Sequence, residues 1–357
     1  MEQTERQLFS LLSEITPLYE APMREARARQ DALAKPPGSL GLLEDLSIQL
    51  AGITGHVKNE VTRTRIYVLA ADNGVVCEGV SSAPQSVTRA QAINLTRGLT
   101  GASCLAKHFG DELIVVDMGI ALPYACPEIV NRSLGKGTAN IAAGPAMARQ
   151  TAVRGILTGM ELAARAKQDG VQILGVGEMG IGNTTTSSAV ASVLLGRPVA
   201  EMTGRGAGLS DAGLHRKIDA IERGIARNHP DAADPLGVLA ALGGFDIAGL
   251  CGVFLGGALE RLPIVMDGFI SGVAALCAVR LCPAAEKAVF ASHVSSEPAA
   301  HIVLDALCKK PLITAELHLG EGTGAVASLP LWDMALAVYN GCYSFAEGGI
   351  TPYTPQC

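Results

Sequence analysis

Residues 175–186 form a glycine-rich segment whose residue types suit the binding of a phosphate group. The segment reads GVGEMGIGNTTT, follows an apolar run and precedes apolar residues at helical spacing. Backbone N–H groups and hydroxyls at the start of a helix attract an anion. We therefore predict that a helix begins at Asn183 and that a monophosphate binds there. A purely structural tight turn is the alternative.

The same segment contains the pattern G-x-G-x-x-G, which is typical of dinucleotide-binding folds. Glu201 follows Gly180 at a distance close to that of a ribose-binding acid. Two features favour a monophosphate over a dinucleotide. Glu178 stands inside the turn that a pyrophosphate would approach, and the predicted helix begins beyond the third glycine. An NAD-linked oxidoreductase is therefore the alternative enzyme class. It predicts that the protein binds NAD and that Glu201 is more important for activity than Glu321.

A second glycine-rich loop, at residues 203–209, precedes the basic run from His215 to Lys217. Glycines allow the backbone to form an anion-binding nest, and a nearby lysine adds a point charge. A solvated basic helix face explains the run equally well, and spacing alone leaves both interpretations open.

The segment LGEGTGA at residues 319–325 places a carboxylate, Glu321, between glycines. Such a carboxylate lies close to the backbone and can reach a bound substrate as a general base. On the residues alone, an ordinary turn with an exposed acid is the simpler interpretation.

Five short apolar runs are expected to position these loops. Each run is followed by Gly, Asp, Ser or His and then by a helix-like segment. Buried runs joined by long crossovers predict an α/β fold, a parallel sheet with helices on both faces. Ligands of such sheets bind beyond the carboxyl ends of the strands, where Asp72, Asp117, Glu178, Asp267 and His293 are expected. The predicted strands are residues 66–70, 113–116, 173–176, 264–266 and 288–291.

Both ends of the chain have helical patterns without strand-like runs. Leu43, Leu46 and Leu50 recur at helical spacing, with Ser39 as the expected N-cap, and the pattern returns from residue 331. We predict a small helical domain from residues 1–60 and 331–357, and a large domain from residues 61–330. The apolar stretch 249–259 fits either a core helix or a subunit interface.

Composition excludes several other classes. The chain has 357 residues, 48% of them apolar and 4% aromatic, and a net charge of −6 without a long basic run, so we expect no nucleic-acid partner. Nine cysteines without a C-x-x-C pair predict a reducing, cytoplasmic location.

The acidic N-terminus does not fit a signal peptide, and the uncharged stretch 179–196 is too rich in Gly, Ser and Thr for a membrane span. The histidines form no metal-binding pattern, so no metal is expected.

Ten motifs occur in one order along the chain, and together they are far more specific than any single glycine loop. They are KPPGSLG at 35–41, ADNGV at 71–75, EGVS at 78–81, PQSVT at 84–88, GEMGIGNTT at 177–185, GRGAGL at 204–209, GGFDIAG at 243–249, MDGFIS at 266–271, SH at 292–293 and LGEGTGA at 319–325. Over residues 35–330 the sequence closely resembles the nicotinate-nucleotide–dimethylbenzimidazole phosphoribosyltransferase family.

The resemblance implies a Rossmann-like large domain, a small helical domain made from both chain ends, and a homodimer. The implied reaction moves ribose 5-phosphate from nicotinate mononucleotide to dimethylbenzimidazole, with inversion at the anomeric carbon, in assembly of the lower ligand of cobamides. It releases nicotinate and needs neither metal nor cofactor. The glycosidic nitrogen of the donor is already a cationic pyridinium, so it leaves without an acid, whereas the incoming benzimidazole must lose its N–H proton to a base.

Site residues carry over from the same motifs. Glu321 is implied as the general base, Glu178 lies near the ribose or the incoming base, and Lys217 helps to hold the donor phosphate. The phosphate is further implied to contact Gly177, Gly180, Gly182, Asn183, Thr184 and Thr185. The aromatic base is implied to contact Ser81, Ser82, Ala83 and Gln91. The other implied substrate contacts are Gly206, Ser292, His293, Leu319 and Gly320.

Two departures from the family pattern bear on the acceptor. Many relatives have a histidine at the position of Asn73, and some have a serine at the position of Ala83, which removes one hydrogen bond to the aromatic base. Other benzimidazoles, purines and phenols are therefore alternative acceptors. A nucleotide-binding subunit without activity is the non-enzymatic alternative, and the intact Glu321 loop argues against it.

Overall fold

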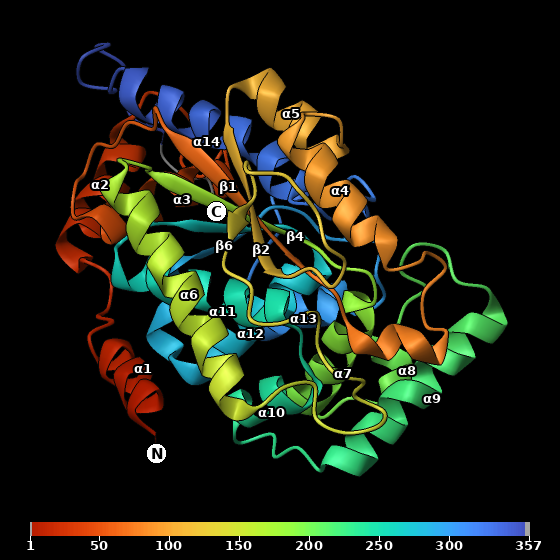
Figure 1. Cartoon of the computed structure of the whole chain (residues 1–357). Coiled ribbons are helices and arrows are strands. Elements are labelled where there is room, and N and C mark those ends of the chain that lie inside the picture. The colour runs from red at the N-terminus through yellow and green to blue at the C-terminus, as the bar shows by residue number, and fades with distance from the viewer. Residues whose placement is uncertain (1, 354–357) are drawn as a thin grey trace.

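A six-stranded parallel sheet lies at the centre of the computed structural model, which describes residues 2–353 (Figure 1). The strand order β3-β2-β1-β4-β5-β6 reverses beside β1, as in Rossmann-like sheets. The strands are β1 (Thr64–Ala71), β2 (Glu112–Gly119), β3 (Val130–Asn131), β4 (Ile173–Met179), β5 (Ile264–Met266) and β6 (Val289–Ala291). The predicted α/β fold and its five strands are confirmed. The two-residue β3 is too short to leave a pattern in the sequence.

Helices cover both faces of the sheet (Figure 1). Those on one face are α3 (Leu42–Thr54), α4 (Ser86–Thr96), α5 (Gly101–Phe109) and α14 (Thr323–Gly341). Those in the larger core on the other face include α1 (Gln3–Ser13), α6 (Arg149–Gln168), α7 (Asn183–Leu195), α9 (Asp211–Asn228), α10 (Pro235–Leu242), α11 (Phe245–Leu259), α12 (Phe269–Leu281) and α13 (Ala300–Ala306). The remaining helices are α2 (Glu20–Ala32), the short α8 (Val199–Met202) and the 3-10 helices η1 (Gly74–Glu78) and η2 (Pro283–Ala288).

Strand β1 is buried on both sides, which explains its continuous apolar run. Ile66, Val68 and Ala70 join the core beneath α3 and α14. The alternate residues Tyr67 and Leu69 join the core on the other face. Successive side chains of a strand point to opposite faces, so one run of residues binds both helical layers to the sheet.

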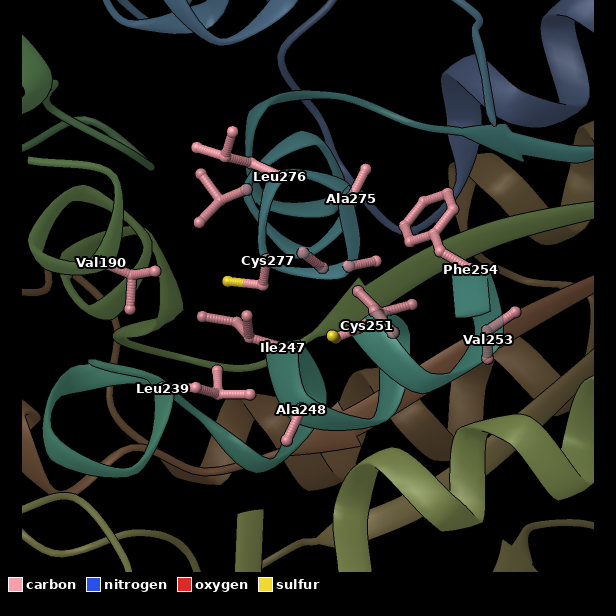
Figure 2. Packing of buried hydrophobic residues seen from close by; sticks show 14 of the residues in the cluster. Val190, Leu239, Ile247, Ala248, Cys251, Val253, Phe254, Ala275, Leu276 and Cys277 are labelled. Atoms are coloured by element: carbon pink, nitrogen blue, oxygen red, sulfur yellow. The ribbon is translucent and has the colours of Figure 1, made fainter. Parts of the chain in front are cut away.

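Helix α11 is a core helix, which decides between the two interpretations of its apolar stretch. Every residue from Phe245 to Ala258 is buried within the chain, and Figure 2 shows Ile247, Cys251 and Phe254 among side chains of the neighbouring helices. A Cβ at Gly252 would lie 1.9 Å from the carbonyl oxygen of Ile156 in α6. The two helices can therefore pack backbone to backbone only because glycine occupies the contact.

The two ends of the chain lie side by side. Arg29 in α2 donates a hydrogen bond of 3.1 Å to the carbonyl of Tyr339 in α14, and the Ala34 amide donates one of 2.9 Å to the carbonyl of Tyr343. Helix α14 begins at Thr323, so it crosses the expected boundary at residue 330, and the division into two domains stays a prediction. The expected cap of α3 was wrong, because Gly41 stands at the N-cap and no side chain caps the helix. Within residues 2–353, no helix is long and apolar enough to cross a membrane.

Candidate active site

A cavity of about 290 Å³ lies beyond the carboxyl ends of β4, β5 and β6. This is the edge at which ligands of doubly wound sheets bind. The predicted site residues that line it are Ala83, Gln91, Glu178, Gly180, Asn183, Thr184, Gly206, His293, Leu319, Gly320 and Glu321. Another cavity, of about 310 Å³, is lined mainly by α3 and residues 286–291 and shares no residue with the first. We therefore place the candidate active site in the first cavity.

Glu321 stands at the centre of a turn in which three successive residues have left-handed backbone angles. Gly320, Glu321 and Gly322 have φ values of 81°, 63° and 90°. A residue with a Cβ adopts this conformation at a cost of about 1–2 kcal/mol, so the surrounding contacts must enforce it. Gly177 in β4 allows the turn to approach, because a Cβ there would lie 2.3 Å from the Gly322 amide nitrogen.

The Glu321 side chain is buried and only partly hydrogen-bonded. Its Oε1 accepts a hydrogen bond of 3.2 Å from Gln91 Nε2, while Oε2 is buried and has no hydrogen-bond partner within the geometric limits among residues 2–353. Burial raises the pKa of Glu321, and Thr100, the Ala102 amide and Gln91 oppose that rise. A lone buried carboxylate oxygen with a raised pKa is suited to accept a proton.

Glu178, at the end of β4, belongs to a cluster of buried carboxylates. Asn183 Nδ2 donates both to Glu178 Oε2 and, over 2.9 Å, to Asp246 Oδ2. Burial, together with the charge of Asp246, raises the pKa of Glu178 to about 8, and burial raises the pKa of Asp246 to about 6. The charges of Asp267 and Glu321 add to the effect on Glu178. Such a cluster favours a cation in the cavity.

Lys217 is completely buried, so the solvated-face interpretation is wrong for this residue. Its Nζ donates to Thr184 Oγ1 (2.8 Å) and to the Gly204 carbonyl (2.9 Å), and burial lowers its pKa to about 8. Arg216, the next residue back along α9, instead contacts the carbonyl of Gly79 from an exposed position. Lys217 thus joins the two glycine-rich loops just behind Thr184 and Gly206, which line the cavity.

Helix α7 begins at Asn183, as predicted, with Gly182 as the N-cap at φ 94°. Asn183 directs its side-chain amide toward carboxylates, and the buried Thr185 hydroxyl has no hydrogen-bond partner in the part of the chain that the structure describes. The candidate phosphate-binding end of the cavity is therefore formed by Thr184 and Gly206, and not by all the predicted residues from Gly177 to Thr185. Gly182 and Thr185 do not line the cavity.

The predicted serines support the cavity from outside its wall. Ser81 Oγ accepts a hydrogen bond from the Ala83 amide (3.2 Å), and Ser82 Oγ donates to the Ala207 carbonyl (3.0 Å). Ser292 Oγ donates to the Asp267 carbonyl and contacts His293 Nδ1, both over 3.0 Å.

The G-x-G-x-x-G pattern does not form a dinucleotide-binding turn. Gly175 and Gly177 lie inside β4, opposite Ile66 and Val68 of β1. Glu201 is half exposed on α8, 3.9 Å from Arg197. The glycines of a dinucleotide fingerprint stand in the turn after the strand, so the geometry disfavours the NAD-linked alternative.

Asn73 lies outside the cavity wall and is completely buried. Its Nδ2 donates to the Ile181 carbonyl (3.4 Å), and its own carbonyl accepts a bond of 3.0 Å from Gln85 Nε2. Asn73 therefore supports the segment that precedes α7.

Asp246 and Phe269 were not among the predicted site residues, and Asp267 was expected at the carboxyl edge of the sheet but was given no role. Asp267 and Phe269 line the cavity and belong to the quoted motif MDGFIS, and Asp246 belongs to GGFDIAG, so motif membership could have identified them. The apolar wall consists of Ala83, Val87, Met179, Ile181, Phe269, Ile270 and Leu319. Ala83 and Leu319 were in the predicted set, and the other five lie within the quoted motifs without having been assigned a role.

A doubly wound sheet with buried carboxylates at its carboxyl edge defines an α/β enzyme of the Rossmann-like class. A family model for phosphoribosyltransferases matches residues 15–350. The matched range includes every residue that lines the cavity.

The chain is similar to named relatives along nearly its whole length. The nicotinate-nucleotide–dimethylbenzimidazole phosphoribosyltransferase of Acetivibrio thermocellus is 47% identical, over 98% of this chain and 99% of the relative. The enzyme of the same name from Roseiflexus sp. is 48% identical, over 96% of this chain and 98% of the relative. The crystal structure of CobT from Thermus thermophilus matches with a TM-score of 0.89 at 40% identity, over 93% of this chain and 100% of that one. The chain therefore belongs to the nicotinate-nucleotide–dimethylbenzimidazole phosphoribosyltransferase family.

Proposed function

We propose that this enzyme transfers ribose 5-phosphate from nicotinate mononucleotide to 5,6-dimethylbenzimidazole or a related lower-ligand base. The products are α-ribazole 5′-phosphate and nicotinate. The observation that carries the proposal is the Glu321 carboxylate, which has one buried oxygen without a partner in a cavity lined by further carboxylates. This arrangement suits the cationic pyridinium ring of the donor and an acceptor that must lose a proton.

In the reaction, the bond between the anomeric carbon and the pyridinium nitrogen breaks, and its electron pair leaves with nicotinate. A bond forms from the same carbon to a benzimidazole nitrogen on the opposite face of the ribose. Glu321 takes the N–H proton of the benzimidazole, a contribution of about 10²–10⁴-fold to the rate. The carboxylates of the cavity, when ionised, stabilise the positive charge that develops on the sugar.

The two ends of the cavity suit the two ends of the substrates. Thr184 and Gly206, backed by the Lys217 ammonium, form a site for the donor phosphate. Phe269, Ile181 and Val87 provide apolar contacts for a flat aromatic base. Ala83 offers that base a methyl group and no hydrogen bond, so we leave a different benzimidazole, a purine or a phenol as the alternative acceptor.

We also propose that the enzyme is a cytoplasmic homodimer. Free thiols support a reducing compartment, since all eight cysteines among the described residues are unpaired. The dimer rests on the family resemblance, and light scattering of the purified protein tests it. The absence of a metal or cofactor requirement is likewise a prediction.

The first experiment mixes the purified protein, nicotinate mononucleotide and dimethylbenzimidazole without metal, and separates the products by chromatography. We expect free nicotinate and a ribazole phosphate in equal amounts. Nicotinate without the conjugate would indicate hydrolysis or the wrong acceptor, and parallel reactions with adenine, p-cresol and other benzimidazoles identify the preferred base. No turnover with any acceptor would refute the proposed function.

A further inference from the structure

We propose that Asp267 is a positioning residue for Glu321: its carboxylate holds the turn at residues 320–324 so that the Glu321 carboxylate faces the cavity. The inference rests on the proposed function, because it takes Glu321 as the base. It adds a residue that lies 54 positions away in the sequence and follows a different strand.

The contacts of Asp267 are directed at the turn itself. Oδ2 accepts a hydrogen bond of 3.0 Å from the Gly322 amide, and Oδ1 accepts one of 2.7 Å from the Gly324 amide. Gly322 is the N-cap of α14, and a carboxylate at a helix N-terminus is favoured by the unpaired N–H groups there. Both amides lie within three residues of Glu321, so one side chain fixes the backbone that carries the base.

The turn depends on this support because its backbone conformation is otherwise unfavourable. Glu321 has a left-handed φ of 63°, a conformation that persists only where neighbouring contacts enforce it. The Glu321 side chain accepts a hydrogen bond from Gln91 in α4, and Thr100 and the Ala102 amide at the start of α5 also act on its charge. These side-chain contacts come from the α4–α5 side, and the Asp267 carboxylate holds the backbone that carries Glu321 on the side of β5.

The charged groups around Glu321 and Asp267 come from three neighbouring strands. Glu178 ends β4, Asp267 follows β5, and His293 follows β6 with its Nδ1 3.9 Å from Asp267 Oδ1. The negative charge of Asp267 contributes to the raised pKa of Glu321. Removal of this charge is expected to lower the pKa of Glu321, whereas a loss of folded protein alone would leave it unchanged.

Asp267→Asn tests the inference, because asparagine keeps the shape but has only one oxygen to accept the two amides. We expect kcat to fall about 10²-fold, the size of effect that misplacing a catalytic group by 1 Å produces, with little change in the KM for nicotinate mononucleotide. The acidic limb of the kcat profile should move to lower pH. In a Glu321→Gln background, the same substitution should cause no further loss, because the base it positions is already absent.

Asp117→Asn is the matched control. Asp117 is also a buried strand-end aspartate that accepts a backbone amide, from Ile120 at 2.7 Å, but it lies outside the cavity. We expect it to leave kcat and the pH profile unchanged. If Asp267→Asn does not fold, Asp267→Ser removes both carboxylate contacts without placing an amide group against the Gly322 and Gly324 amides, and it should show a loss of kcat with the same dependence on Glu321.

Two results would overturn the inference alone. One is an Asp267→Asn loss that is equally large in the Glu321→Gln background, which would mean that Asp267 acts on the substrate directly. The other is a lowered kcat with an unmoved acidic limb. A wild-type enzyme that forms no conjugate would overturn the proposed function together with the inference, so the two failures are distinguishable.

Discussion

Replacing Glu178 by glutamine should stabilise the protein at alkaline pH while changing its stability little at pH 5. Burial and the charges of Asp246, Asp267 and Glu321 raise the pKa of Glu178 from 4.5 to about 8. Glutamine has the same shape, and its amide oxygen can still accept the hydrogen bond from Asn183. The substitution therefore removes the charge and keeps the packing.

The size and sign of the effect follow from linkage between protonation and folding. Below pH 4.5, Glu178 is protonated in both the folded and the unfolded chain, so its ionisation does not affect the free energy of unfolding. Between pH 4.5 and about 8 the unfolded chain loses the proton while the folded chain retains it, so the folded state of the wild type loses stability as pH rises. The full difference corresponds to about 5 kcal/mol, and coupling to the neighbouring carboxylates reduces it, so we expect about 2–5 kcal/mol.

Urea unfolding followed by circular dichroism between pH 5 and pH 9 measures this difference. The free energy of unfolding of Glu178→Gln relative to the wild type should increase with pH, without a change in the denaturant slope. Glu201→Gln is the control, because Glu201 is exposed. The free energy of unfolding of this variant should change with pH in the same way as that of the wild type. A Glu178→Gln advantage that is the same at pH 5 and pH 8.5 would refute the assignment of a buried, proton-retaining carboxylate.

Three further predictions concern the reaction. Glu321→Gln should lower kcat about 10²–10⁴-fold with little effect on the KM for nicotinate mononucleotide, as measured by the formation of ribazole phosphate. A near-normal kcat would contradict the role of Glu321 as the base. Lys217→Met should mainly raise the KM for nicotinate mononucleotide, and the wild-type KM should rise above pH 8 as the ammonium loses its charge. An unchanged KM in the variant would remove Lys217 from the phosphate site. Placing the cationic pyridinium ring of the donor beside Glu178 near pH 7 should release a proton from that residue, seen by calorimetry in buffers of different ionisation enthalpy. Glu178→Gln should abolish the release.

Local patterns in the sequence predicted the elements of the fold. The apolar run at residues 66–70 marks β1, because a strand buried on both faces has no room for polar side chains. The start of α7 at Asn183 was readable because the preceding glycines and the following hydroxyl residues are signals of a helix N-terminus. Strand β3 was not predicted, because a strand of two residues shows no periodic pattern in the sequence.

The motifs in the sequence determined the family and nominated Glu321, Glu178 and Lys217, but their surroundings depend on contacts between distant segments. Spacing left Lys217 equally compatible with a solvated helix face, and only its burial against Gly204 and Thr184 decided the matter. Asp246 reaches Glu178 through Asn183, and Asp267 reaches the Glu321 turn from another strand. Burial and the approach of like charges set the pKa values of the site, and both arise only when the sheet brings the ends of its strands to one edge.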